Sequence, residues 1–137
     1  MVRIATRACV AVLASGLMLG ASGCSSSPDT PEATLAAFLH ALGEGDVEAA
    51  CALVVYDKEP LQGDDLLLCQ GGFRNVVEQV ATEQELAQLR AAEVTGSAVS
   101  GDQATVLPEQ IEGVPAAYEL TVSLVRIDGT WFVVSTP

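Results

Sequence analysis

From residue 30 to about residue 92, apolar positions recur with the period of a helix. The first helix is expected to begin at Thr30-Pro31-Glu32, which supplies a capping hydroxyl, a proline for the first turn and an acid at the positive end of the helix dipole. Its apolar stripe consists of Leu35, Phe38, Leu39 and Leu42. Gly43 is expected to end the helix, because glycine readily adopts the left-handed conformation that follows a last turn.

Two further helical segments are expected before residue 70. Asp46 is a suitable cap for a helix whose inward-facing residues extend to Val54. Residues 56–63 are then predicted to form a loop around Pro60, because proline lacks the backbone N–H that regular structure needs. Helical structure is expected to resume over residues 64–69.

Two glycines and a capping motif divide the rest of the helical region. Gly71 and Gly72 are expected to interrupt the helix, and helical spacing of apolar residues resumes over residues 73–80. Thr82 followed by Glu85 matches a capping box, in which each residue's side chain bonds to the backbone of the other. A short helix is therefore predicted to begin there.

After Ala92 the pattern changes to one typical of strands. Residues 94–99 and 104–107 flank a tight-turn sequence, and residues 118–124 alternate apolar with polar side chains, as a half-buried strand does. Asp128-Gly129 lies between two apolar runs, which is a strong hairpin signal. The alternation slips near Val125, so a bulge is expected there. Helices followed by four antiparallel strands predict a single α+β domain, with N-terminal helices packed on one face of a four-stranded antiparallel sheet.

The first 24 residues have the layout of an export signal. Arg3 and Arg7 precede an apolar run over residues 8–23, which ends in small residues. A helix that spans a membrane needs roughly 20 strongly apolar residues, so a permanent transmembrane anchor is the weaker interpretation. An ordinary cleaved signal that leaves Cys24 free is the alternative.

The run Leu17-Met18-Leu19-Gly20-Ala21-Ser22-Gly23-Cys24 resembles a bacterial lipoprotein signal. The resemblance implies that residues 1–23 are removed and that fatty acids such as palmitate are attached to Cys24. Residues 24–30 would then form a flexible tether to a domain at residues 31–137. Because two or more acyl chains hold a protein stably at a bilayer, we expect a lipid-anchored protein on the extracytoplasmic face of the cell membrane.

Cys51 and Cys69 are the cysteines expected in the mature domain. Export places them in an oxidising setting, which favours a disulfide between them. Pro60 lies midway, so a helical hairpin that turns near it would bring the two cysteines level. Two buried free thiols are the alternative. Zinc is disfavoured, because the chain has one histidine and no closely spaced cysteine pair. No metal and no cofactor is therefore expected.

The chain is strongly acidic, with a formal net charge of −12 at pH 7. Loss of the signal would make it more acidic, since Arg3 and Arg7 would leave with it. Binding to nucleic acid needs Lys and Arg to neutralise phosphates, so nucleic acid is excluded as a partner. A solvated acidic surface that keeps the domain soluble is favoured over an acidic docking patch.

A second resemblance concerns the domain itself. The chain carries Phe38-Leu39, then Gly45-Asp46 and Ala49-Ala50-Cys51, then a second cysteine, and it closes on Val125-Arg126-Ile127-Asp128-Gly129-Thr130-Trp131-Phe132-Val133. These features resemble small actinobacterial lipoproteins with a nuclear-transport-factor-2-like domain, over residues 31–137. The resemblance implies a curved sheet that wraps around helices as a cone. It implies architecture much more than activity.

The sequence contains no nucleophile elbow, phosphate-binding loop or dinucleotide-binding fingerprint. We therefore expect a non-catalytic module, with no catalytic residue, that binds another envelope protein or a small apolar ligand. The alternative is an isomerase- or dehydratase-type enzyme, because enzymes of the resembled superfamily use polar residues inside the cone. Glu119 would be its cavity carboxylate, with Tyr118 beside it, although a solvated strand position is favoured for Glu119. His40 is expected at the surface or rim.

Overall fold

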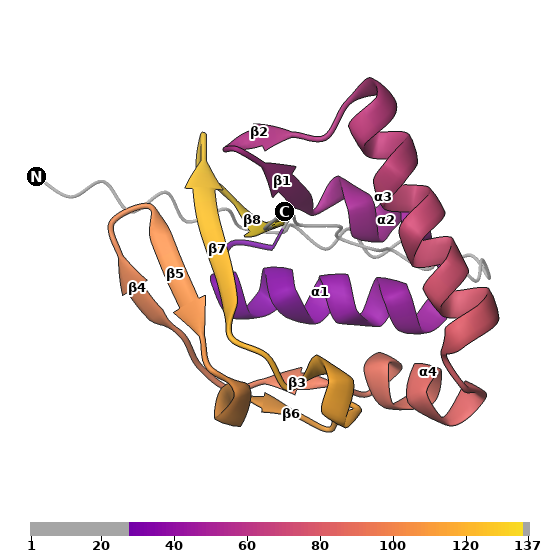
Figure 1. Cartoon of the computed structure of the whole chain (residues 1–137). Helices are drawn as coiled ribbons and strands as arrows, with labels where there is room; N and C mark the ends of the chain where they lie inside the picture. The colour runs from indigo at the N-terminus through magenta and orange to yellow at the C-terminus, as the bar shows by residue number, and fades with distance from the viewer. Residues whose placement is uncertain (1–27, 136–137) are drawn as a thin grey trace, which may run out of the picture.

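The computed structural model describes residues 28–135, in which helices pack on a mixed β-sheet (Figure 1). The α-helices are α1 (Pro31–Glu44), α2 (Val47–Ala52), α3 (Gly63–Asn75) and α4 (Glu83–Arg90). The strands are β1 (Val54–Tyr56), β2 (Glu59–Pro60), β3 (Glu93–Val94), β4 (Ala98–Ser100), β5 (Gln103–Val106), β6 (Ile111–Glu112), β7 (Val122–Ile127) and β8 (Thr130–Val134). The shorter helical pieces are η1 (Val76–Val80), η2 (Pro108–Gln110) and η3 (Ala116–Tyr118). The predicted signal, Cys24 and most of the predicted tether lie outside the described residues.

The main sheet has six strands in the order β2-β1-β8-β7-β5-β4, and β3 pairs with β6 in a separate two-stranded sheet. The prediction of four antiparallel strands is therefore wrong, although the α+β class is confirmed. The difference arises at Val54, which was expected on a helix. The helix ends at Ala52, and Val54 and Val55 form a strand that runs parallel to β8, opposite Val133 and Val134. β-branched residues suit such a buried strand.

The first helix begins where the sequence predicts and ends slightly later. The Thr30 hydroxyl accepts a hydrogen bond from the backbone N–H of Ala33 at 3.1 Å. The helix continues through Gly43 to Glu44, and Gly45 takes the left-handed conformation with φ 75°. Gly43 instead allows α4 to approach, since a Cβ there would lie 2.6 Å from the backbone nitrogen of Arg90.

The third helix differs from its prediction. α3 runs through Gly71 and Gly72 without interruption and continues into η1, a π-helical turn. The capping box is confirmed: the Thr82 backbone N–H donates to Glu85 Oε2 at 2.7 Å, and the Glu85 backbone N–H donates to the Thr82 hydroxyl at 3.2 Å. α4 therefore begins as expected.

Both predicted hairpins form, but the strands around them are shorter. β4 and β5 meet at Gly101-Asp102, and β7 and β8 meet at Asp128-Gly129. β7 begins only at Val122, because η3 extends to Tyr118 and residues 119–121 form a short connection instead of strand. The expected bulge near Val125 is absent, since the pairing of β7 with β5 and β8 is continuous. The pattern slips because Leu124 and Val125, on opposite faces, are both buried.

The core lies between α1, α4 and the helix-facing side of the sheet. Its largest members are Leu35, Leu39, Leu42, Leu89, Ile111, Leu124 and Trp131. Three of the four residues of the predicted first stripe are among them. The fourth, Phe38, is half-buried and packs edge-on against Phe73 of α3, with 5.5 Å between ring centroids. None of the helices within residues 28–135 has the length and apolar character needed to cross a bilayer.

Candidate functional site

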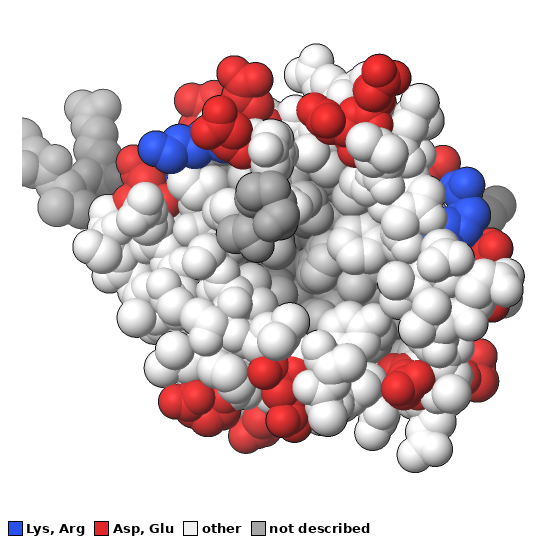
Figure 2. All heavy atoms as spheres, viewed as in Figure 1, with Lys and Arg blue, Asp and Glu red and all other residues white. Residues whose placement is uncertain are grey.

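A pocket of about 420 Å³ lies between α3 and the edge of the sheet at β1. Figure 2 shows that this face of the molecule is hollowed near its centre, between the strands and α3, with uncharged side chains around the hollow and acidic side chains above and below it. The apolar lining consists of Val54, Leu61, Leu68, Phe73 and Val76. Three polar side chains, Tyr56, Asp65 and Ser135, also line it. The pocket is mainly apolar, with a few polar groups at its wall.

The pocket exists because α3 does not pack closely on the rest of the domain. None of its residues is buried, and Leu67 and Leu68 are 66% and 74% exposed. In Figure 1 the helix runs along one side of the molecule, across the ends of α1 and α2. Its apolar residues are therefore only partly covered, and Leu68 lines the pocket while facing solvent.

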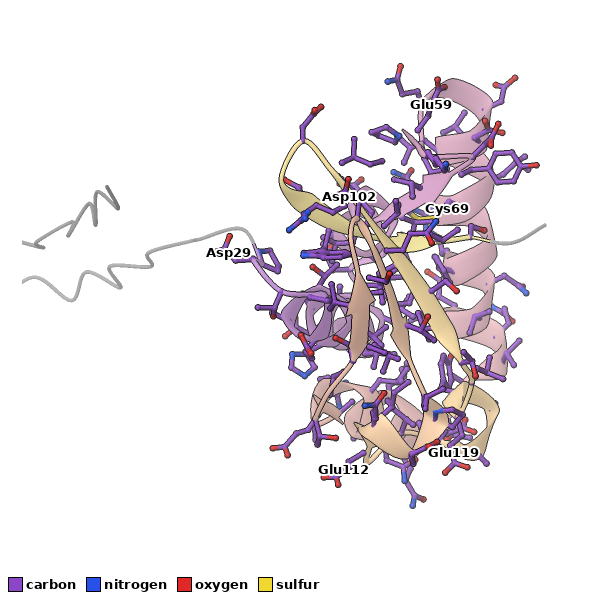
Figure 3. All side chains as sticks on the ribbon, turned by 90° about the vertical axis from the view of Figure 1, so that its left-hand side faces the viewer. Asp29, Glu59, Cys69, Asp102, Glu112 and Glu119 are labelled. Carbon is purple, nitrogen blue, oxygen red and sulfur yellow. A yellow bond between two sulfur atoms is a disulfide. The ribbon has the colours of Figure 1, made fainter. Side chains whose placement is uncertain are left out.

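A disulfide attaches α3 to the domain. Cys51 and Cys69 are bonded, with their Cα atoms 6.1 Å apart, which confirms the predicted pair. Cys51 is buried on α2, and Cys69 lines the pocket (Figure 3). The chain between them does not form the expected helical hairpin. It forms the β1–β2 hairpin, and Pro60, predicted in a loop, belongs to β2.

The β1–β2 hairpin builds an acidic hollow beside the pocket. Its turn residues Asp57 and Lys58 have φ of 49° and 65°, the left-handed conformation of a type I′ hairpin turn. A hollow of about 280 Å³ lies next to this turn, and Asp57, Glu59 and Asp65 are among its lining residues. Tyr56, Leu61 and Asp65 line both this hollow and the apolar pocket, so the two spaces adjoin.

The residues of the predicted enzyme alternative lie elsewhere. Glu119 is exposed, follows η3 and lies at the same end of the molecule as Glu112, away from Glu59 (Figure 3). Tyr118 is half-buried against the core, and burial, with a smaller effect of the Glu85 charge, raises its pKa. Neither residue lines the pocket. The carboxylate that does is Asp65, which lies in the segment 64–69 that the sequence predicted to be helical.

The single histidine has a structural partner. His40 is half-buried, and its Nε2–H donates a hydrogen bond to the Ala92 carbonyl at 2.8 Å. This bond joins α1 to the segment that follows α4. Within residues 28–135, no group of three or more His, Cys, Asp or Glu is arranged to hold a metal ion.

Comparison with known proteins gives no match: no family model, no curated protein and no solved structure is significantly similar to this chain. The class of this protein is therefore described from its fold and its pocket alone. The protein is a mixed α+β domain with an open, mainly apolar pocket between a weakly packed helix and a sheet edge.

Proposed function

We propose that this protein is a lipid-anchored, extracytoplasmic binding module that takes the apolar part of a small ligand into the pocket between α3 and β1. The observation that carries the proposal is the pocket of about 420 Å³, whose size and lining suit a small molecule. Its wall is a helix with no buried residue, so entry of a ligand would cover apolar surface that now contacts water.

The lining supports binding more than chemistry. Ligand pockets are typically apolar with a few polar groups that fix orientation, and this pocket has Tyr56, Asp65 and Ser135 in that role. We propose that the module is non-catalytic. Among these groups, Asp65 is the only carboxylate, and it is exposed.

The lipid anchor rests on the sequence around Cys24, and its resemblance to a lipoprotein signal supports it. Because α1 begins at Pro31, the segment between an anchor at Cys24 and the first helix would span only about 20 Å even when fully extended. The resemblance to nuclear-transport-factor-2-like lipoproteins supports the same placement. The pocket would then lie close to molecules that partition into the membrane.

Filling the pocket from α3 tests the binding function. Gly72 lines the pocket, and a Cβ built there meets no atom within 4 Å. Gly72→Leu should therefore place a side chain in the pocket without disturbing the fold. Gly71→Leu is the matched control, because Gly71 is equally open in the same helix but does not line the pocket.

The assay is binding of N-phenyl-1-naphthylamine, a neutral apolar fluorescent probe, to the whole chain. We expect saturable binding that Gly72→Leu weakens at least about tenfold and Gly71→Leu leaves within about twofold, the difference corresponding to the lost burial of a few methylene groups. Equal binding by both variants, or none by the unaltered protein, would refute the proposal.

Mass spectrometry of the protein from membranes tests the anchor separately. The N-terminal peptide should begin at Cys24 and carry the mass of a diacylglyceryl group. A peptide that begins at Cys24 with a free thiol would show an ordinary cleaved signal instead.

A further inference from the structure

We propose that the ligand of this pocket is an amphiphile with a positively charged head, which lies against the acidic hollow at the β1–β2 hairpin while its apolar body fills the pocket. This inference rests on the proposed binding function and names its ligand class. The geometry that suggests it is the junction of the two spaces, where Tyr56, Leu61 and Asp65 line both.

The charged side chains that line the two spaces are all acidic. Asp57 and Glu59 of the hairpin and Asp65 of α3 line the acidic hollow, and no Lys or Arg within residues 28–135 lines either space. Lys58 lies in the hairpin turn but lines a different hollow, on the strands β5 and β7. Of the three other cations in residues 28–135, Arg90 pairs with Glu83 and Arg126 pairs with Asp102, while Arg74 lies near the end of α3.

The tyrosine at the junction also favours a positively charged head. Tyr56 is 46% exposed and lines both spaces. The face of an aromatic ring attracts ammonium groups, most strongly where water is partly excluded. A cationic head at this point would therefore meet an aromatic ring as well as carboxylates.

The site should bind ligands with a positive, a neutral and a negative head to different extents. An ammonium head gains attraction from the carboxylates, a neutral head gains none, and a carboxylate head is repelled. Because Asp57, Glu59 and Asp65 are all exposed, solvent screens the attraction. We expect a preference of about fivefold for an ammonium over a neutral head of the same chain length at low salt.

The experiment measures displacement of N-phenyl-1-naphthylamine from the whole chain by octylammonium, 1-octanol and octanoate. Only the probe signal that Gly72→Leu removes is counted, which restricts the comparison to this pocket. Octylammonium should displace the probe at about one fifth of the octanol concentration, and octanoate should be the weakest. Raising the ionic strength from about 0.01 M to about 1 M should remove the preference for octylammonium, because the screening length falls from about 30 Å to about 3 Å.

A matched pair of double variants separates local charge from net charge. Glu59→Gln with Asp65→Asn should remove most of the ammonium preference, because both side chains lose their negative charge. Glu112→Gln with Asp64→Asn makes the same change in net charge; Asp64 adjoins Asp65 but lines neither space, and Glu112 lies at the far end of the molecule (Figure 3). This control should keep the preference.

Each outcome decides between the proposals. Equal displacement by octylammonium and octanol, or a preference for octanoate, would overturn the cationic head while leaving the apolar pocket in place. The same loss of preference in both double variants would also overturn it, because general charge would then be responsible. No displacement by any of the three would contradict the proposed function itself.

Discussion

Removal of the Cys51–Cys69 disulfide should destabilise the domain by about 3 kcal/mol. The two cysteines are 18 residues apart in the sequence. In the chain-entropy model, a cross-link that closes a loop of this size stabilises the folded state by about 3 kcal/mol, because it restricts the unfolded chain. The double variant Cys51→Ala with Cys69→Ala leaves no free thiol. Its midpoint of urea unfolding should fall accordingly.

The structure also predicts which part of the domain opens first when the disulfide is removed. α3 has no buried residue and is attached to the domain by the disulfide, the Phe38–Phe73 contact and its contacts with α2. The core of α1, α4 and the sheet does not depend on it, because its fully buried residues lie on other elements. Without the bond, α3 should detach at a smaller free energy than global unfolding requires. The pocket should then lose its wall.

Hydrogen exchange followed by mass spectrometry measures this directly. Peptides covering residues 63–80 should exchange much faster in the double variant, while those of β7 and β8 change only as much as global stability does. The unaltered protein treated with a thiol reductant is the control, because it keeps both sulfur atoms and loses only the bond. Stability lowered by less than about 1 kcal/mol, or equal acceleration in α3 and β7, would refute this reasoning.

Two further predictions concern the helices. Gly43→Ala should destabilise the domain by about 2 kcal/mol, because the added Cβ would lie 2.6 Å from the Arg90 nitrogen and 2.7 Å from the Leu86 carbonyl oxygen and would force α1 and α4 apart. Thermal unfolding measures this, with Gly71→Ala as the control that should be neutral or slightly stabilising; equal effects at the two positions would contradict the close approach. In the capping box, hydrogen bonds from the Thr82 backbone N–H and hydroxyl hold the pKa of Glu85 below its usual value. The folded state therefore favours the carboxylate, so its contribution is present above the ordinary pKa of glutamate and is lost as the pH falls through the lowered one. The stability advantage of the unaltered protein over Glu85→Gln should thus shrink between pH 7 and about pH 3, and an advantage that grows in acid would exclude this cause.

The sequence predicted the parts of the fold that depend on neighbouring residues. The cap at Thr30, the capping box at Thr82 and Glu85, and the hairpin at Asp128-Gly129 each need only a few adjacent residues, and each forms as expected. The cysteine pair was also predictable, because the candidates were few.

Glycine was the main source of local error. Gly43 was expected to end α1, and Gly71 and Gly72 were expected to break α3, yet all three lie inside helices. Gly43 is required by the crossing of α4, which no local pattern indicates. Glycine lowers helix propensity only by about 1 kcal/mol, and neighbouring structure can override that cost.

The sequence alone determined where α1 and α4 begin, the hairpins at Gly101-Asp102 and Asp128-Gly129, the cystine pair and the acidic character of the chain, because these follow from local chemistry and composition. Tertiary structure decided that Val54 joins a strand beside Val133, which adds β1 and β2 to the sheet. It also decided that Asp65, and not Glu119, lines the pocket between α3 and β1. Both outcomes depend on contacts between residues far apart in the chain, and the pattern of neighbouring residues carries little information about such contacts.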